Sequence, residues 1–140
     1  YCLETHVHAD HVTGVDRLRG ATGCMGIVPI YAPVSCADRR IEHGELLSLG
    51  EILVEAIATP DHTDSHMAYR INGHRVLTGD ALFIRGFSTI AEEKRWNPRV
   101  AGRSRQEFIE FMNNLNLPNP KKMMEAVPAN ELCGRMAMIA

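Results

Sequence analysis

Short apolar runs separated by turn-forming residues occupy the first half of the chain and predict a series of strands. Residues 26–31 are one such run, and their apolar character predicts a short buried strand. Pro29 within it favours a position near a sheet edge, because proline cannot donate to a strand ladder. Two further runs, residues 45–49 and 52–58, meet at Gly50, which predicts a β-hairpin.

The strongest turn signal in the chain is Asn72-Gly73, between residues 67–71 and 75–78. Asparagine and glycine tolerate the positive φ of a two-residue hairpin turn, so a second hairpin is expected here. Residues 1–4 are typical of the end of another strand.

Two segments predict helices. Val12, Val15 and Leu18 recur at helical spacing, and we expect Gly20 and Gly23 to end that helix. A second helix is predicted from a capping box, Ser104 with Glu107, followed by an apolar stripe and ended by Asn116 and Pro118. That stripe consists of Phe108, Met112 and Leu115. Residues 87–102 show little periodicity, and the tail from residue 119 is expected to be a loop with one turn of helix at residues 121–126.

Composition predicts a single globular domain spanning residues 1–140. The chain is 45% hydrophobic and 23% charged, as in an ordinary soluble protein, and its net charge of −2 argues against a nucleic-acid partner. It contains no apolar run of membrane-spanning length and no signal peptide, so we expect no membrane association and a cytoplasmic location. The four cysteines form no C-x-x-C pair and are expected to be thiols. Because it opens on Tyr1, the chain is expected to be a fragment or a trimmed product.

The segment from residue 5 to residue 11 has the residue types of a metal site. Four of its seven residues can ligate a metal, in the order His6, His8, Asp10, His11. His6 and His8 are two apart, so both would point the same way at a strand end. Imidazole combined with carboxylate suits zinc, iron or manganese.

One short segment does not complete a metal site, so further ligands are expected downstream. His62 lies in Thr59-Pro60-Asp61-His62-Thr63, and Asp80 lies in Thr78-Gly79-Asp80-Ala81-Leu82. Each motif follows a predicted strand, where a rigid sheet can position loop residues.

These three motifs, in this order, resemble the metallo-β-lactamase superfamily and, within it, the persulfide dioxygenase (sulfur dioxygenase) family. The likeness rests on residues 4–14, 62–67 and 78–86, and residues 113–118 and 126–130 resemble that family's C-terminus. It implies an α/β (α+β) fold, the αββα sandwich of two sheets with helices outside, here incomplete.

The resemblance also implies an enzyme of hydrogen sulfide metabolism, a non-haem Fe(II) dioxygenase that oxidises glutathione persulfide with O₂ to sulfite and glutathione. It assigns one Fe(II) per chain to His6, His62 and Asp80, leaving open positions for substrate and O₂. His8, Asp10 and His11 would then be hydrogen-bonding groups around the ligands, or extra ligands. No metal spacing involves His43, His66 or His74, which are expected to be exposed or packed. Glutathione is anionic, so substrate-binding candidates are Arg85, Arg95, Arg99 and Arg103, although each would equally be an ordinary solvated residue.

The sequence departs from the family pattern in three ways. A strand-rich segment normally precedes the first motif, whereas this chain begins almost on that motif. A second segment is missing between residues 86 and 89. In relatives it carries an arginine-threonine-aspartate segment and a proline-glycine-histidine motif. No histidine follows His74 here. Asp61 stands where relatives have glycine, so a positive φ there would strain the backbone.

Two alternatives to the dioxygenase stay open. A zinc hydrolase of glyoxalase II (thioesterase) type would need a second metal, held by Asp10, His11 and the absent later histidine. A non-catalytic metal-binding remnant would account for the missing segments. With the first strands missing, the sheet that holds His6 should have an unpaired edge and an exposed apolar face, so we expect self-association into a homo-oligomer or a low melting temperature.

Overall fold

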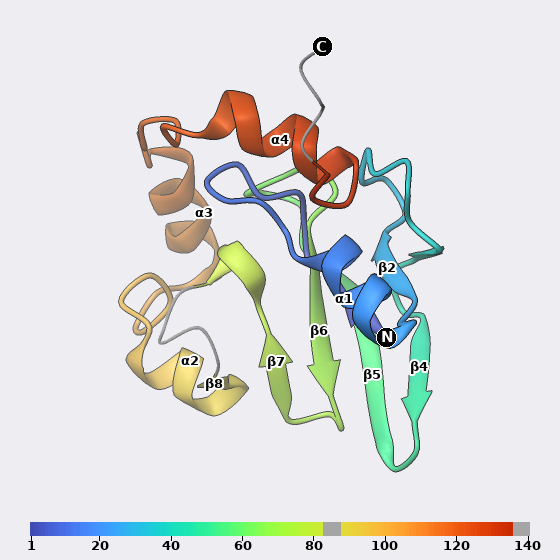
Figure 1. Cartoon of the computed structure of the whole chain (residues 1–140). Helices are drawn as coiled ribbons and strands as arrows, with labels where there is room; N and C mark the ends of the chain where they lie inside the picture. Colours follow the sequence, from blue (N-terminus) through green and yellow to red (C-terminus); the bar gives the residue numbers. More distant parts are fainter. Residues whose placement is uncertain (83–87, 136–140) are drawn as a thin grey trace.

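Two β-sheets form the centre of the computed structural model, which describes residues 1–82 and 88–135 (Figure 1). The first sheet is parallel, in the order β1 (Cys2–Leu3), β2 (Gly26–Pro29), β3 (Arg39–Ile41). The second is antiparallel, in the order β4 (Leu46–Leu49), β5 (Ile52–Ala58), β6 (Met67–Ile71), β7 (Arg75–Leu77), β8 (Ser88–Thr89).

Both predicted hairpins are confirmed. Strands β4 and β5 pair antiparallel up to Leu49 and Ile52, with Gly50 in the turn at φ +64°. Between β6 and β7 the turn residues Asn72 and Gly73 have φ values of +47° and +77°. Positive φ at both positions matches the right-handed twist of the flanking strands, which is why this dipeptide predicts the turn so well.

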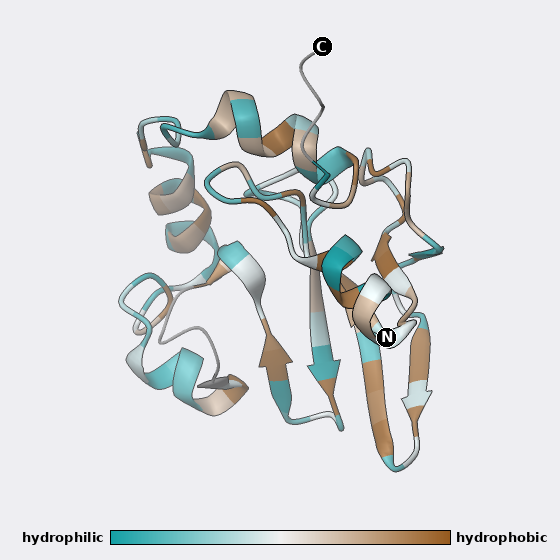
Figure 2. Cartoon of the chain, viewed as in Figure 1, coloured by the Kyte–Doolittle hydropathy of each residue, from teal (hydrophilic) through white to brown (hydrophobic). Residues whose placement is uncertain are grey.

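The main core lies between the two sheets. Ile27 and Ile41 of the parallel sheet pack against residues of the antiparallel sheet, and Figure 2 shows apolar residues along β2, β5 and β7. The antiparallel sheet contributes Leu47, Val54, Ala56, Met67 and Tyr69. Because side chains alternate along a strand, the outer face of β4 and β5 carries Leu46 and Leu53, which are 53% and 42% exposed.

The other face of the parallel sheet is covered. Val28 packs with Val15 of helix α1 (Val15–Thr22), Val34 and Cys133 in a second core cluster. The predicted exposed apolar face on the sheet that holds His6 is therefore wrong, although β1 is at its edge as expected. Helix α1 ends at Gly23, as predicted, with φ +67°.

Three details of the predicted elements are wrong. Gly20 lies inside α1 and does not end it, and only Val15 of the predicted apolar stripe is buried. Pro29 lies in the central strand of its sheet. It is tolerated there because β1 pairs with β2 only up to Ile27, so Pro29 at the end of β2 lies beyond that ladder.

Within the described part of the chain, four helical segments follow the second hairpin. They are the 3₁₀ turn η1 (Gly79–Ala81) and helices α2 (Ile90–Trp96), α3 (Arg105–Asn113) and α4 (Met123–Glu131). The Ser104–Glu107 capping box is confirmed at the start of α3. Helix α2 was not predicted, although Thr89 and Glu92 form the same kind of capping box. None of the helices that the structure describes is long and apolar enough to cross a membrane.

The expectation of free thiols is wrong for two of the cysteines. Cys36 and Cys133 form a disulfide with a Cα–Cα distance of 6.1 Å, and Cys2 and Cys24 are free. The two bonded residues are 97 positions apart, so no local spacing indicated the pair. The bond joins the loop before β3 to the chain directly after α4.

Candidate metal centre

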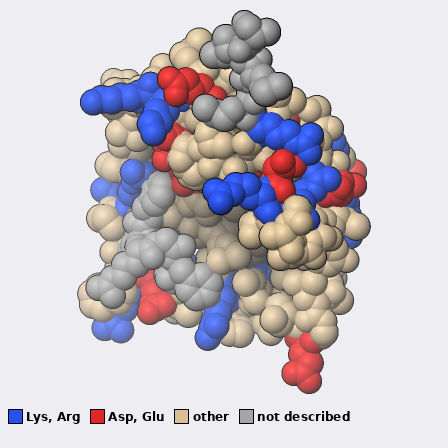
Figure 3. Space-filling view, viewed as in Figure 1, with Lys and Arg blue, Asp and Glu red and all other residues tan. Residues whose placement is uncertain are grey.

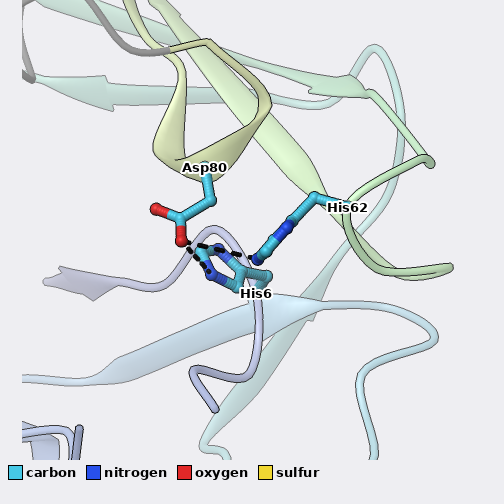
Figure 4. A group of neighbouring side chains, drawn as sticks. All are labelled: His6, His62 and Asp80. Carbon is cyan, nitrogen blue, oxygen red and sulfur yellow. Dashed lines mark ion pairs between the residues drawn. The ribbon is translucent and has the colours of Figure 1, made fainter. Parts of the chain in front are cut away.

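The three predicted ligands His6, His62 and Asp80 converge (Figure 4). The Nε2 atoms of His6 and His62 lie 3.6 and 3.4 Å from the same oxygen, Oδ2 of Asp80. His6 follows β1, His62 lies in the loop after β5, and Asp80 lies in η1 after β7. The sheets thus bring together side chains that are far apart in the sequence.

His6 has the environment expected of a metal ligand. Its side chain is fully buried, and its Nδ1 lies 2.8 Å from Oγ1 of Thr5, while Nε2 is buried without a hydrogen-bond partner among the described residues. Burial, reinforced by His8, His66 and His62, lowers the pKa of His6 to about 3. The imidazole is therefore neutral at pH 7, with a lone pair available, and an unpartnered buried nitrogen facing a carboxylate fits a cation between them.

The centre is accessible from one side. The side chains of His62 and Asp80 are 43% and 27% exposed, in contrast to His6 at 0%. The arrangement anchors one imidazole in the protein interior and presents the other two groups toward solvent. A small molecule can therefore approach from the side of His62 and Asp80.

His8, Asp10 and His11 form a second, adjacent group. Nδ1 of His11 lies 2.9 Å from Oδ1 of Asp10, and Nδ1 of His8 lies 3.8 Å from the same oxygen. The ring of His8 is 4.2 Å from that of His6, centroid to centroid. Burial, followed by the proximity of His11, lowers the pKa of His8. All six residues of the predicted site are thus near one another, but in two groups of three.

Two cavities lie beside the segments that carry His62 and Asp80. One of about 550 Å³ is lined by His62, Val7, Met123, Asp64 and Glu131, among others. The other, of about 470 Å³, is lined by Asp61, Ala81, Leu82, Arg103, Arg105 and Phe108, among others. The second cavity is largely apolar with two arginines on its wall.

Of the four predicted substrate-binding arginines, Arg103 lines the second cavity. Its guanidinium lies 4.5 Å from the ring of Phe111, and that of Arg95 lies 4.7 Å from the ring of Trp96. Neither Arg95 nor Arg99 lines the two cavities at the site, and Arg85 lies outside the described residues. On the face shown in Figure 3, basic and acidic side chains are intermixed, and no large patch of one sign is visible among the described residues.

The expected backbone strain at Asp61 is wrong. Among the described residues, the non-glycine residues with positive φ are Asn72 and Cys133. Asp61 donates its backbone N–H to the carbonyl of Thr63 at 3.3 Å. A residue with a Cβ is therefore accommodated at position 61 without a positive φ.

Four residues that support the centre were not predicted from the sequence. They are Thr5, His66, Gly79 and Asn130. Oδ1 of Asn130 accepts from the N–H of Thr13 at 2.7 Å, and Nδ2 donates to the carbonyls of His8 and His11 at 2.8 Å. Asn130 lies in the segment that resembles the family's C-terminus, which was the only sequence signal for it. His43 and His74 are exposed, as expected.

Comparison with known proteins yields one family and several relatives. The family model described as "Metallo-beta-lactamase superfamily" matches residues 1–122. "Persulfide dioxygenase ETHE1, mitochondrial" of Homo sapiens is 33% identical over 177 positions, covering 96% of this chain and 69% of the human protein. This chain has 140 residues, so at least 37 of those positions have no counterpart in it, in agreement with the expected internal shortening.

Solved structures give the same grouping. ETHE1 from Myxococcus xanthus superimposes with a TM-score of 0.81 at 37% identity, covering 95% of this chain and 76% of that one. A metallo-beta-lactamase from Staphylococcus aureus subsp. aureus COL, at 13% identity and a TM-score of 0.79, shares the fold. A hydroxyacylglutathione hydrolase of Rhodopseudomonas palustris (strain BisB18) is 34% identical, but the match covers 64% of this chain and 36% of the hydrolase.

Proposed function

The chain belongs to the metallo-beta-lactamase superfamily and, within it, to the persulfide dioxygenase family, and from this premise we propose that it oxidises glutathione persulfide with O₂, releasing sulfite and glutathione. The overall reaction consumes one persulfide, one O₂ and one water. The outer sulfur is oxidised and becomes sulfite, O₂ is reduced, and the inner sulfur leaves as the glutathione thiol.

The observation that carries this proposal is the convergence of His6, His62 and Asp80 around the unpartnered Nε2 of His6. Two imidazoles and one carboxylate are the donor set of non-haem Fe(II) oxygenases. We propose that these three residues hold one Fe(II). When bound, the ion supplies the one-electron chemistry toward O₂ that organic side chains lack.

The protein groups around the ligands have definable tasks. The contact between Thr5 Oγ1 and Nδ1 of His6 at 2.8 Å fixes the ring direction, so that Nε2 faces Asp80. The low pKa of His6 keeps its imidazole deprotonated at physiological pH. These features keep a neutral nitrogen ready to bind a cation.

The cavity of about 470 Å³ is the better candidate for the glutathione part of the substrate. Arg103 and Arg105 on its wall match the carboxylates of an anionic tripeptide. The same cavity also has one carboxylate, Asp61, on its wall. The cavity beside Met123 is bordered by two carboxylates, Asp64 and Glu131, with no arginine or lysine among its described lining residues, so it would repel that ligand more strongly. Arg103→Ala should therefore raise KM for glutathione persulfide more than it lowers kcat, as steady-state O₂ uptake would measure.

The hydrolase alternative has less support. A dinuclear centre of the glyoxalase II type needs a later histidine, and no histidine follows His74 in the sequence. The matched hydrolases are covered over little more than a third of their length. If the hydrolase alternative were correct, the metal would be zinc. The cytoplasmic location of the chain stays a prediction.

The direct test measures metal content and O₂ uptake together. After anaerobic reconstitution with Fe(II), the purified protein should bind about one iron per chain and consume O₂ with glutathione persulfide, forming sulfite. His6→Ala, His62→Ala and Asp80→Ala should each lose the iron and the activity. His74→Ala is the matched control, because His74 is exposed on the β6–β7 turn, and it should retain both.

Other outcomes would contradict the proposal. Two tightly bound zinc ions with hydrolysis of a glutathione thioester would favour the hydrolase. Bound iron without O₂ uptake would identify a non-catalytic metal-binding protein.

A further inference from the structure

One buried side chain, His66, contacts all three segments that carry the candidate ligands. It immediately precedes β6 and is 1% exposed. Its ring stacks on that of His6, with the centroids 5.0 Å apart and an interplanar angle of 26°. The ring of His62 lies 6.3 Å away, nearly perpendicular at 85°.

His66 also closes the turn that carries His62. Its Nδ1 lies 2.8 Å from Oγ1 of Thr59, and its backbone carbonyl accepts from the N–H of Thr59 at 3.0 Å. Thr59 and His66 flank the segment that contains His62, so these two contacts join its ends. The His66 ring is therefore in direct contact with one end of the segment on which His62 lies.

The third contact is with the turn that carries Asp80. A Cβ built on Gly79 would lie 2.8 Å from Nε2 of His66. The ring therefore lies directly against the backbone that begins η1, one residue before Asp80. Nε2 is buried and has no hydrogen-bond partner among the described residues. An apolar residue would fill this space without burying a polar atom, so the imidazole needs an explanation beyond packing.

We infer that His66 is a positioning residue of the metal centre, whose ring sets the relative placement of His6, His62 and Asp80. This inference rests on the proposed metal site and deepens it. The ring stacks on His6 and contacts Thr59, which begins the segment of His62. It also lies against Gly79, the residue before Asp80. Hydrogen-bonded groups behind metal ligands typically change metal affinity by about 10–100-fold when removed.

The test uses Co(II) as the probe, because its visible d–d absorption reports ligand geometry independently of catalysis. Metal-free protein is titrated with Co(II) for wild type, His66→Phe and His66→Asn. Phenylalanine keeps the ring but loses the contact with Thr59, and asparagine keeps a polar atom near the Nδ1 position but loses the ring. Both should weaken Co(II) binding by about tenfold or more and change the d–d spectrum at saturation. His74→Asn, the exposed control, should leave affinity and spectrum unchanged.

A third variant makes the test independent of whether the His66 substitutions fold. Thr59→Val is nearly isosteric and removes only the side-chain contact that orients the ring, so it should also alter the Co(II) spectrum. Folded variants of His66, or Thr59→Val, with wild-type affinity and spectrum would overturn the positioning role. A wild-type protein that binds no Co(II) would instead overturn the proposed metal centre, and the inference with it.

Discussion

Gly79 is required for the close approach of the candidate ligands. It has φ +50°, and a Cβ on it would lie 2.6 Å from Oγ1 of Thr5 and 2.8 Å from Nε2 of His66. Thr5 contacts His6, and Gly79 is adjacent to Asp80. Glycine therefore meets two requirements here, a left-handed backbone and the absence of a side chain.

Gly79→Ala should destabilise the fold by about 3 kcal/mol, from roughly 1 kcal/mol for the positive φ and roughly 2 kcal/mol for overpacking. Gly50→Ala is the matched control, since Gly50 has φ +64° but a Cβ added to it would meet nothing within 4 Å. It should cost only about 1 kcal/mol. Urea unfolding followed by circular dichroism would measure both, and equal costs would show that the contacts around Gly79 are not tight.

Helix α4 holds the loop from His8 to Thr13 through the side chain of Asn130. Asn130 is 2% exposed and holds the loop between His8 and Thr13 by three hydrogen bonds. In Figure 1 this helix lies across that loop, although more than a hundred residues separate them in the sequence. The loop that carries His8, Asp10 and His11 therefore owes its conformation to the C-terminal part of the chain.

Asn130→Ala should lower the free energy of unfolding by about 3 kcal/mol, because it leaves three partly buried backbone groups without their partner. Asn114→Ala is the comparison. Asn114 is exposed and donates one hydrogen bond, to the carbonyl of Glu110 at 2.7 Å, so its loss should cost at most about 1 kcal/mol. Thermal unfolding would separate the two, since about 1 kcal/mol corresponds to roughly 3–5 °C in a domain of this size. A similar Tm for both variants would contradict the role of α4.

The disulfide links the loop before β3 to the chain that follows α4. Cys36 precedes β3 and Cys133 follows α4, three residues after Asn130. Cys133 is buried against Val15, Val28 and Val34 in the core cluster outside the parallel sheet. The bond therefore holds the C-terminal helix onto the sheet from which His6 emerges.

Reduction or Cys36→Ser should lower the free energy of unfolding by about 3–4 kcal/mol, because the bond closes a long loop in the unfolded chain. Cys24→Ser, which removes a free cysteine, should have little effect. Denaturant unfolding with and without a phosphine reductant would measure this. Thiol titration of the unfolded, unreduced chain should find two reactive cysteines, and four would refute the bond.

The remaining expectation at the scale of the whole molecule is self-association. The edge at β1 is present, and exposed Leu46 and Leu53 lie on the other sheet. Association through either surface stays a prediction, which sedimentation velocity would check.

The sequence by itself determined the features that depend on neighbouring residues. Asn72-Gly73 and Gly50 specify hairpins through their own φ preferences, and the Ser104–Glu107 capping box starts α3 for the same local reason. The resemblance of the three motifs to the persulfide dioxygenase family also singled out His6, His62 and Asp80, because motif residues are read directly from the sequence.

The tertiary structure alone decided features that depend on distant partners. Strand β3 has one apolar residue and exists because β2 pairs with it. Helix α4 contains Pro128, which favours a loop locally, yet burial of Ala126, Ala129 and Asn130 stabilises the helix. The disulfide and the position of His66 against His6 likewise join residues that no local spacing relates. Local preferences are encoded within a few residues, whereas packing is settled only when the sheets bring remote segments together.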